Sequence, residues 1–115
     1  MKFSESLKKY DDFKSVYNSG KSYANKYLVM YVSENSLGIN RIGISVSKKV
    51  GNSVIRHRLT RLIRESYRLH EEMFSSGLDI VVIARNTAAR IRFAEAESAF
   101  LHLSRLHKII KKNNE

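Results

Sequence analysis

The most constraining feature of the sequence is a change of hydrophobic period between residues 47 and 51. Before it, RIGISVS at 41–47 alternates apolar with small or polar residues, which is typical of a strand. After it, GNSVIRHRLTRLIRES at 51–66 repeats at helical spacing, and LDIVVIA at 78–84 is a short apolar run that follows the stop signal Gly77. A strand, a helix and a strand in this order predict two parallel strands joined by a crossover helix.

The flanking segments predict further helices and strands. DDFKSVYNSG at 11–20 predicts a short helix with Asp11 or a neighbour as its cap and Gly20 at its end. The run 23–33 is rich in β-branched and aromatic residues and predicts strand, whereas 93–111 repeats its apolar residues at helical spacing.

Together these segments predict an α/β (α+β) sandwich in the order α-β-β-β-α-β-α. The number of strands before residue 41 stays open. At 115 residues the chain has the usual size of one domain, so we predict a single domain over 1–115, with the tail KKNNE frayed.

Positive charge is concentrated in the middle of the chain. The formal net charge is +10 with a pI near 10.0, and residues 41–68 alone carry eight Lys or Arg against one acidic residue. A surface that merely faces solvent normally mixes both signs. We therefore interpret the segment as a nucleic-acid-binding surface, because neutralising phosphates releases counterions.

On a helical wheel the basic residues of 51–68 form one stripe. At ~100° per residue, His57, Arg61, Arg64 and Arg68 fall on one side, flanked by Arg56 and Arg58. The opposite side is apolar and is expected to pack on the sheet, through Ile55, Leu59, Leu62, Ile63, Leu69 and Met73. Arginines in a first helical turn oppose the helix dipole, whereas the same backbone amides attract phosphate. Bound phosphates would offset both this dipole penalty and the mutual repulsion of the arginines.

Three aromatic residues form a second candidate site. Phe13 and Tyr17 lie four residues apart on one face of the first helix, and Tyr31 lies on a strand. From the residues alone, two interpretations of these aromatics are equally good: they belong to the core, or they form a platform on which unpaired bases stack. The alternation over 41–47 leaves a small, polar strand face with room for something to lie against it.

We expect neither a catalytic residue nor a metal site on the protein itself. Asp11 and Asp12 fit a helix cap, and Glu71 and Glu72 fit a solvated helix end. The chain has no cysteine, and three histidines lack partners at ligand spacing: His70, His102 and His107.

We also expect a cytoplasmic protein. No apolar run approaches the ~20 residues of a membrane span, and MKFSESLKKYDDF lacks the apolar core of a signal peptide. The absence of cysteine fits a reducing compartment.

The run SVSKKVGNSVIRHRLTRLIRES resembles the protein subunit of bacterial ribonuclease P. In that family a strand ending in Ser-Lys-Lys leads through Gly-Asn into a helix with Arg-Asn-Arg and further basic residues. LKKYDDFKSVYNSGKSYANKYLVMYV and DIVVIAR resemble the same family, so the resemblance covers nearly the whole chain. The central asparagine of the family is His57 here, and Thr60 stands where lysine is frequent.

The resemblance implies an accessory subunit of an endoribonuclease. In this family a large RNA subunit removes the 5′ leader of precursor tRNA, using Mg²⁺ that is held mainly by RNA and substrate, and one protein assembles with one RNA. The protein binds that RNA and the leader, and its βαβ crossover is left-handed. By resemblance the RNA-binding residues are Lys48, Lys49, Asn52, Arg56, His57, Arg58, Arg61, Arg64 and Arg68, and the leader cleft is Phe13, Tyr17 and Tyr31.

Two other functions stay open from the sequence. A small structural RNA-binding protein of the ribosome would share the basic βαβ character. A helix-turn-helix DNA-binding protein ranks third, because its recognition helix closely follows another helix and carries base-reading polar residues, whereas this helix follows a strand.

Overall fold

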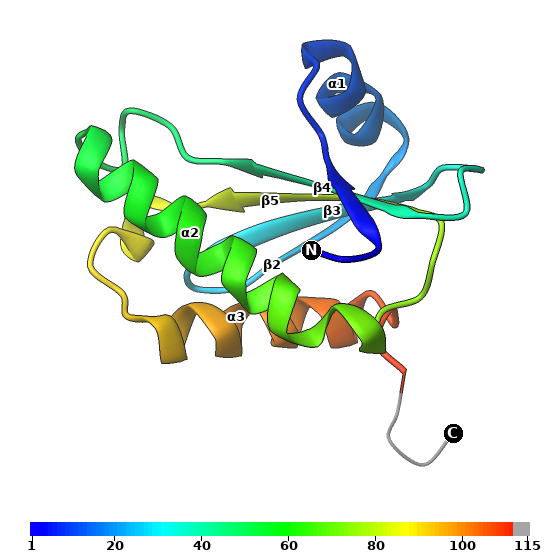
Figure 1. Ribbon diagram of the computed structural model, residues 1–115. Coiled ribbons are helices and arrows are strands. Elements are labelled where there is room, and N and C mark those ends of the chain that lie inside the picture. Colours follow the sequence, from blue (N-terminus) through cyan, green and yellow to red (C-terminus); the bar gives the residue numbers. More distant parts are fainter. Residues whose placement is uncertain (112–115) are drawn as a thin grey trace.

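The computed structural model describes residues 1–111, and within them five strands form one sheet that is flanked by three α-helices (Figure 1). Residues 112–115, most of the tail expected to fray, lie outside the described residues. The elements in chain order are β1 (Ser4–Ser6), α1 (Tyr10–Ser19), β2 (Lys21–Ala24), β3 (Leu28–Glu34), β4 (Asn40–Ser45), α2 (Ser53–His70), η1 (Glu71–Met73), β5 (Leu78–Ala84), η2 (Asn86–Ala88) and α3 (Phe93–Leu106). The predicted order is confirmed, with β1 as an additional strand.

The sheet order is β1-β4-β5-β3-β2. β4 and β5 are parallel, as the βαβ pattern predicts, in a register that runs from Arg41 opposite Asp79 to Ser45 opposite Ile83. β3 is antiparallel to both β5 and β2, and β1 pairs in parallel with the outer side of β4. The left-handed sense of the crossover stays a prediction.

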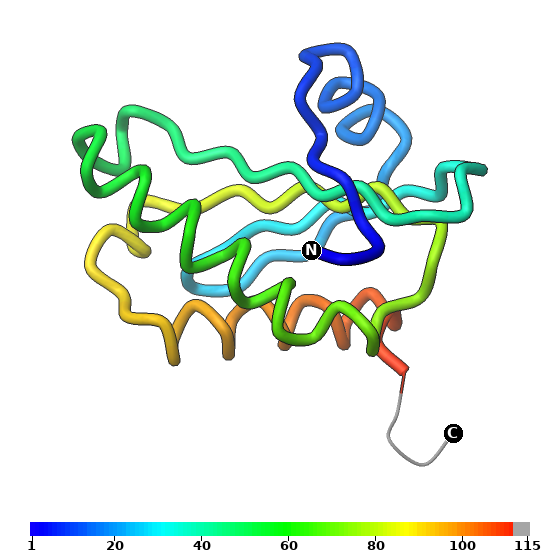
Figure 2. The backbone as a smooth tube through the Cα atoms, in the orientation of Figure 1, coloured from blue at the N-terminus to red at the C-terminus, as the bar shows by residue number. Residues whose placement is uncertain are grey.

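Helices cover both faces of the sheet, and each face has its own apolar cluster. α2 and α3 lie on one face, where Ile80 and Val82 of β5 join the main core with Leu59 and Phe100. α1 lies on the other face, where Val81 packs with Leu7 and Val16 (Figures 1 and 2). The two candidate sites therefore belong to opposite faces of one sheet.

The run 23–33 contributes to two strands, β2 and β3, with a turn between them, so three strands separate α1 from α2 as in the predicted order. Asn25 makes that turn, because its side-chain Oδ1 accepts hydrogen bonds from the backbone N–H groups of Tyr27 (3.2 Å) and Leu28 (3.0 Å). This local bonding competes with a continuous strand and reverses the chain.

Two helix ends differ from expectation. The N-cap of α1 is Lys9 and not an aspartate; Asp11 is exposed in the first turn. α3 ends at Leu106, short of the predicted 111, because Lys108 adopts a positive φ of 59° that breaks the helix. Ile110, predicted on the helical face, instead forms a β-bridge with Phe74.

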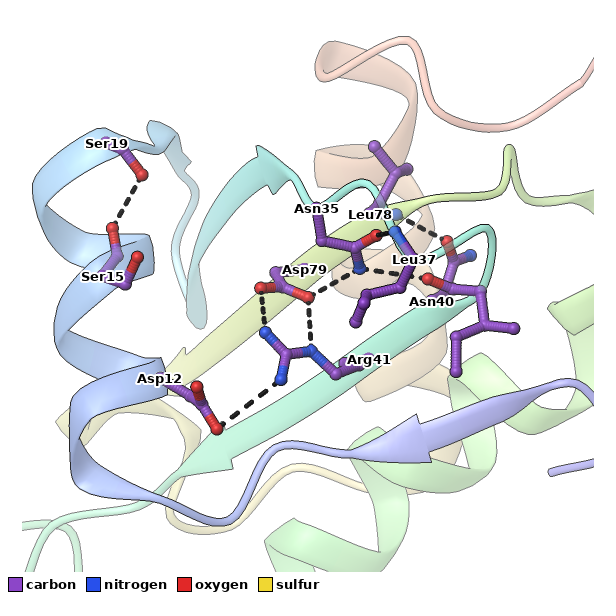
Figure 3. Close-up of polar contacts among 10 residues, drawn as sticks. Asp12, Ser15, Ser19, Asn35, Leu37, Asn40, Arg41, Leu78 and Asp79 are labelled. Carbon is purple, nitrogen blue, oxygen red and sulfur yellow. Dashed lines mark hydrogen bonds and ion pairs between the residues drawn. The ribbon is translucent and has the colours of Figure 1, made fainter.

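A partly buried ion-pair network links α1 to the sheet. Arg41 donates from Nε and Nη2 to the two carboxylate oxygens of Asp79, at 2.9 and 2.7 Å, and its Nη1 lies 3.6 Å from Asp12 of α1 (Figure 3). Asn35 adds a hydrogen bond of 2.8 Å to Asp79. Burial raises the pKa of Asp79, but the bonds from Arg41 and Asn35 outweigh it and hold the pKa below its usual value.

The N-terminal segment is tied to the end of α2 by Glu71. The sequence predicts a solvated helix end here, but Glu71 is buried and accepts hydrogen bonds from the backbone N–H groups of Lys2 (2.8 Å) and Phe3 (3.0 Å). Nearby, the Ser4 hydroxyl lies 2.6 Å from that of Tyr67. These contacts explain why β1 forms although SES alone carries no periodic signal.

Candidate nucleic-acid interface

The basic helix α2 begins at a polar cap. Asn52 is the N-cap, and its side-chain oxygen accepts the backbone N–H of Ile55 at 3.0 Å, which stabilises the first turn. Lys48 and Lys49 are exposed in the turn that leads into it. Two lysines thus lie in the turn just before a helix N-terminus, whose free amides suit phosphate.

The predicted stripe points away from the sheet. His57, Arg61 and Arg68 are exposed, whereas Leu59 and Ile63 on the opposite side are fully buried. The prediction of the apolar side is wrong at its C-terminal end: Leu69 is 50% exposed and Met73 lies beyond the helix in η1. Two polar residues are buried in their place, Ser66 and Tyr67.

These two side chains can be buried because their hydroxyl groups have partners. Ser66 donates to the carbonyl of Leu62 four residues earlier, at 2.8 Å. The hydroxyl of Tyr67 lies near Ser4 and accepts from the side-chain amide of Asn40 at 3.3 Å. A buried polar group that has hydrogen-bond partners loses little free energy on leaving water. Hydrophobicity along the sequence therefore did not identify Ser66 and Tyr67 as core residues.

The arginines of the stripe are not equivalent. Arg58 donates to the backbone carbonyls of Ile91 (2.6 Å) and Ala89 (2.7 Å), and Arg64 donates to the Ser6 hydroxyl at 2.8 Å. Arg68 forms an ion pair with Glu65, and Arg61 has no protein partner among the described residues. Arg56 is partly buried, and its Nε has no partner within the same part of the chain.

The bonds of Arg58 bring a second basic segment beside α2. The loop from β5 to α3, RNTAARIR at 85–92, contains three exposed arginines and no acidic residue: Arg85, Arg90 and Arg92. Sequence reasoning centred on α2 missed this loop. Its charge pattern is visible in the sequence, whereas its position beside the stripe follows only from the fold.

The three predicted aromatics come together on the other face of the sheet. The ring centroids of Phe13 and Tyr17 lie 6.5 Å apart, and those of Tyr17 and Tyr31 lie 5.1 Å apart in an edge-on arrangement. Tyr17 is 37% exposed, and burial of the remainder raises its pKa. The cluster is therefore only partly buried, and solvent reaches it at the ring of Tyr17.

Gly43 provides the space for this cluster, as the small face of 41–47 suggested. A Cβ at this position would lie 2.6 Å from Cζ of Phe13, so the ring rests directly on the β4 backbone. The next row across the sheet consists of Val29, Ile83 and Ser45, which are only partly buried. Together they extend the aromatic cluster into a shallow, uncharged surface.

Among residues 1–111 there is no group of three or more His, Asp or Glu side chains placed to hold a metal ion. Within the same residues, no helix is both long enough and apolar enough to cross a membrane.

Comparison with known proteins adds independent information. The family model described as Ribonuclease P matches residues 1–108. The ribonuclease P protein component of Lachnoclostridium phytofermentans is 63% identical over 107 residues, covering 93% of this chain and 92% of that protein. The Clostridium botulinum (strain Langeland) protein of the same name is 50% identical over 98 residues, covering 84% and 88%.

Solved structures of such proteins share the fold. The RNase P protein of Staphylococcus aureus superimposes with a TM-score of 0.86 at 36% identity, over 92% of this chain and 97% of that one. The Thermotoga maritima RNase P protein gives a TM-score of 0.79 at 33% identity, over 86% and 94%. The sheet and the helices on both of its faces are thus common to this chain and these structures.

Proposed function

The chain belongs to the ribonuclease P protein family, and on that premise we propose that α2 binds the RNA subunit while the aromatic cluster binds the 5′ leader of precursor tRNA. Membership makes the chain the protein component of a ribonucleoprotein endoribonuclease that processes tRNA, with the RNA subunit and precursor tRNA as partners. The geometry supports the assignment of the RNA subunit to one face of the sheet and of the leader to the other.

The single observation that carries the proposal is the separation of two different surfaces. One face presents an exposed arginine stripe that begins at a helix N-terminus, suited to the folded backbone of a large RNA. The other presents three adjacent aromatic rings beside an uncharged strip of sheet, suited to stacked single-stranded bases. Stacking tolerates most base sequences, which suits a protein that must accept many leaders.

The chemistry belongs to the RNA in this proposal. The contribution of the protein in this proposal is to bind and orient the RNA subunit and the substrate. Mg²⁺ would be held by phosphate oxygens of the RNA subunit and the substrate, where it stabilises the charge that develops during hydrolysis. Assembly of one RNA with one protein and a cytoplasmic location complete the proposal.

The proposal is tested by adding purified protein to ribonuclease P RNA and labelled precursor tRNA at low Mg²⁺ concentration. The protein should increase the rate of 5′ cleavage, because its cations replace part of the screening that Mg²⁺ otherwise provides. The chain without RNA should release no leader. If the protein leaves the cleavage rate unchanged, the assignment of its binding surfaces is wrong.

The alternatives are not favoured. The relatives named above are ribonuclease P protein components and not ribosomal proteins. In the structure α2 follows strand β4 through a short turn, so it lacks the preceding helix of a helix-turn-helix.

A further inference from the structure

A groove of about 700 Å³ lies between the stripe of α2 and the beginning of α3. Both helices lie on the same face of the sheet (Figure 1). Leu62 and Phe93 contribute apolar surface to the groove, and the arginines of the stripe line it together with Glu65. Its volume is within the ~300–1,000 Å³ of sites that hold small organic groups.

Phe93 is placed as a wall of this groove and not as part of the core. It is the first residue of α3 and is half-buried, and it belongs to neither apolar cluster of residues 1–111. None of the aromatic ring pairs in those residues includes it. The ring therefore contributes aromatic surface to the groove outside the two apolar clusters.

Arg58 holds this wall in position. Its guanidinium donates to the carbonyls of Ala89 and Ile91, the segment that leads directly into α3. These bonds join the middle of α2 to the residues just before Phe93. Arg58 is thus a positioning residue whose guanidinium is already occupied by protein, although the stripe would suggest that it contacts phosphate.

The charges around the groove suit a nucleotide. Among the described residues that line it, Glu65 is the only one with a carboxylate, and Arg68 neutralises it through two hydrogen bonds that lower the pKa of Glu65. Arg61, also in the lining, is exposed and has no protein partner among the described residues. An apolar floor beside a free guanidinium matches a base and the phosphate attached to it.

We propose that this groove binds one unpaired base of an RNA partner, stacked on Phe93, with an adjacent phosphate on Arg61. The inference deepens the proposed function, on which it rests: α2 would recognise a bulged or looped nucleotide in addition to a paired backbone. Proteins commonly recognise such unstacked bases by aromatic stacking.

The first test compares Phe93→Leu with the parent protein in binding to ribonuclease P RNA. Leucine keeps the apolar wall but removes the aromatic face, so affinity should fall about fivefold or more. The slope of log affinity against log salt concentration should not change, because no phosphate contact is lost. Arg61→Ala should flatten that slope. An unchanged affinity for Phe93→Leu, with its melting temperature preserved, would overturn the proposal.

The second test uses fluorescence, because the chain contains no tryptophan. Phe93→Trp introduces a single indole in the groove, and its emission should be quenched when a base stacks on it. A blunt-ended, fully paired RNA duplex without a loop should quench it much less than the RNA subunit. The matched control is Leu37→Trp, on the exposed turn between β3 and β4, whose emission should change little.

The outcomes separate the two proposals. If the parent protein binds ribonuclease P RNA no better than it binds unrelated RNA, both are wrong. If the parent binds with a steep salt dependence while Phe93→Trp is not quenched by the RNA subunit, only the groove proposal is overturned.

Discussion

At the scale of single residues, hydrogen-bond partners decide what a side chain can do. Arg58 and Arg61 lie three residues apart on α2 and look equivalent in the sequence. Two backbone carbonyls occupy the guanidinium of Arg58, whereas that of Arg61 faces solvent. An arginine with donors already bonded to protein has fewer left for phosphate, so the two should differ in function.

Gly43→Ala should displace the leader-binding cluster. The new Cβ would lie 2.6 Å from Phe13 and 3.1 Å from Leu7, so the ring and α1 must shift. We expect a loss of about 1–3 kcal/mol in the free energy of unfolding and weaker binding of precursor tRNA. Denaturant unfolding and binding assays measure both. Ser98→Ala, at an exposed position of α3 on the other face of the sheet, serves as the control.

His107 should make the stability of the fold sensitive to mild acid. Its Nε2–H donates to the carbonyl of Met30 at 2.9 Å, and its ring packs edge-on against Tyr23. Burial lowers the pKa of His107 below its ordinary value, and Lys21 adds to the effect. The unfolded chain therefore takes up the proton first, so stability should fall as the pH drops below about 6.5 and level off under the folded pKa.

His107→Gln provides the comparison, because its side-chain amide can still donate to Met30 but does not titrate. Unfolding curves recorded between pH 7.5 and 5 should show a smaller loss of stability for the variant than for the parent. Parallel pH profiles would show that His107 contributes nothing to acid sensitivity.

At the scale of the element, α2 combines a buried face with a phosphate-binding face. Leu59 and Ile63 are on the side opposite Arg61, so a change at Arg61 leaves the packing on the sheet intact. This separation allows the electrostatic role of the helix to be measured without disturbing the fold.

Arg61→Ala should weaken RNA binding across different sequences. Loss of one phosphate contact should flatten the slope of log affinity against log salt concentration by about one unit at most. The control is Arg105→Ala, an exposed arginine in the last turn of α3. Equal slopes for the parent and Arg61→Ala would mean that the stripe only faces solvent.

At the scale of the whole molecule, the sheet separates two binding surfaces. The aromatic cluster with α1 and the basic stripe of α2 occupy opposite faces, and the side chains of β5 alternate between their two cores. Changes on one face should therefore have little effect on the other, and their free-energy effects should add.

Tyr17→Ala should weaken binding of precursor tRNA to the assembled ribonucleoprotein by roughly tenfold, since stacking contributes ~1–3 kcal/mol per base. Mature tRNA has no leader, so its binding should stay nearly unchanged. Combined with Arg61→Ala, the two losses in precursor binding should add. Equal losses for precursor and mature tRNA, together with a lower melting temperature, would show that Tyr17 is a core residue.

The sequence alone predicted the order of the elements, the parallel pair around α2 and the exposed stripe. These depend on periodicity and on short-range signals such as Gly20, which acts over a few residues. The same patterns placed Phe13 and Tyr17 on one helical face, and Gly43 on a strand face with room above it.

Tertiary structure decided the contacts between distant segments. Tyr31 meets α1, Glu71 anchors the N-terminal strand, and Arg58 fastens the loop before Phe93 because the folded chain brings partners together over 14 to 69 residues. No local pattern encodes such partners, since a polar residue in the sequence can equally be solvated or bonded. The buried Ser66 and Tyr67 show the same limit: their burial depends on partners that exist only once the sheet and α2 are packed.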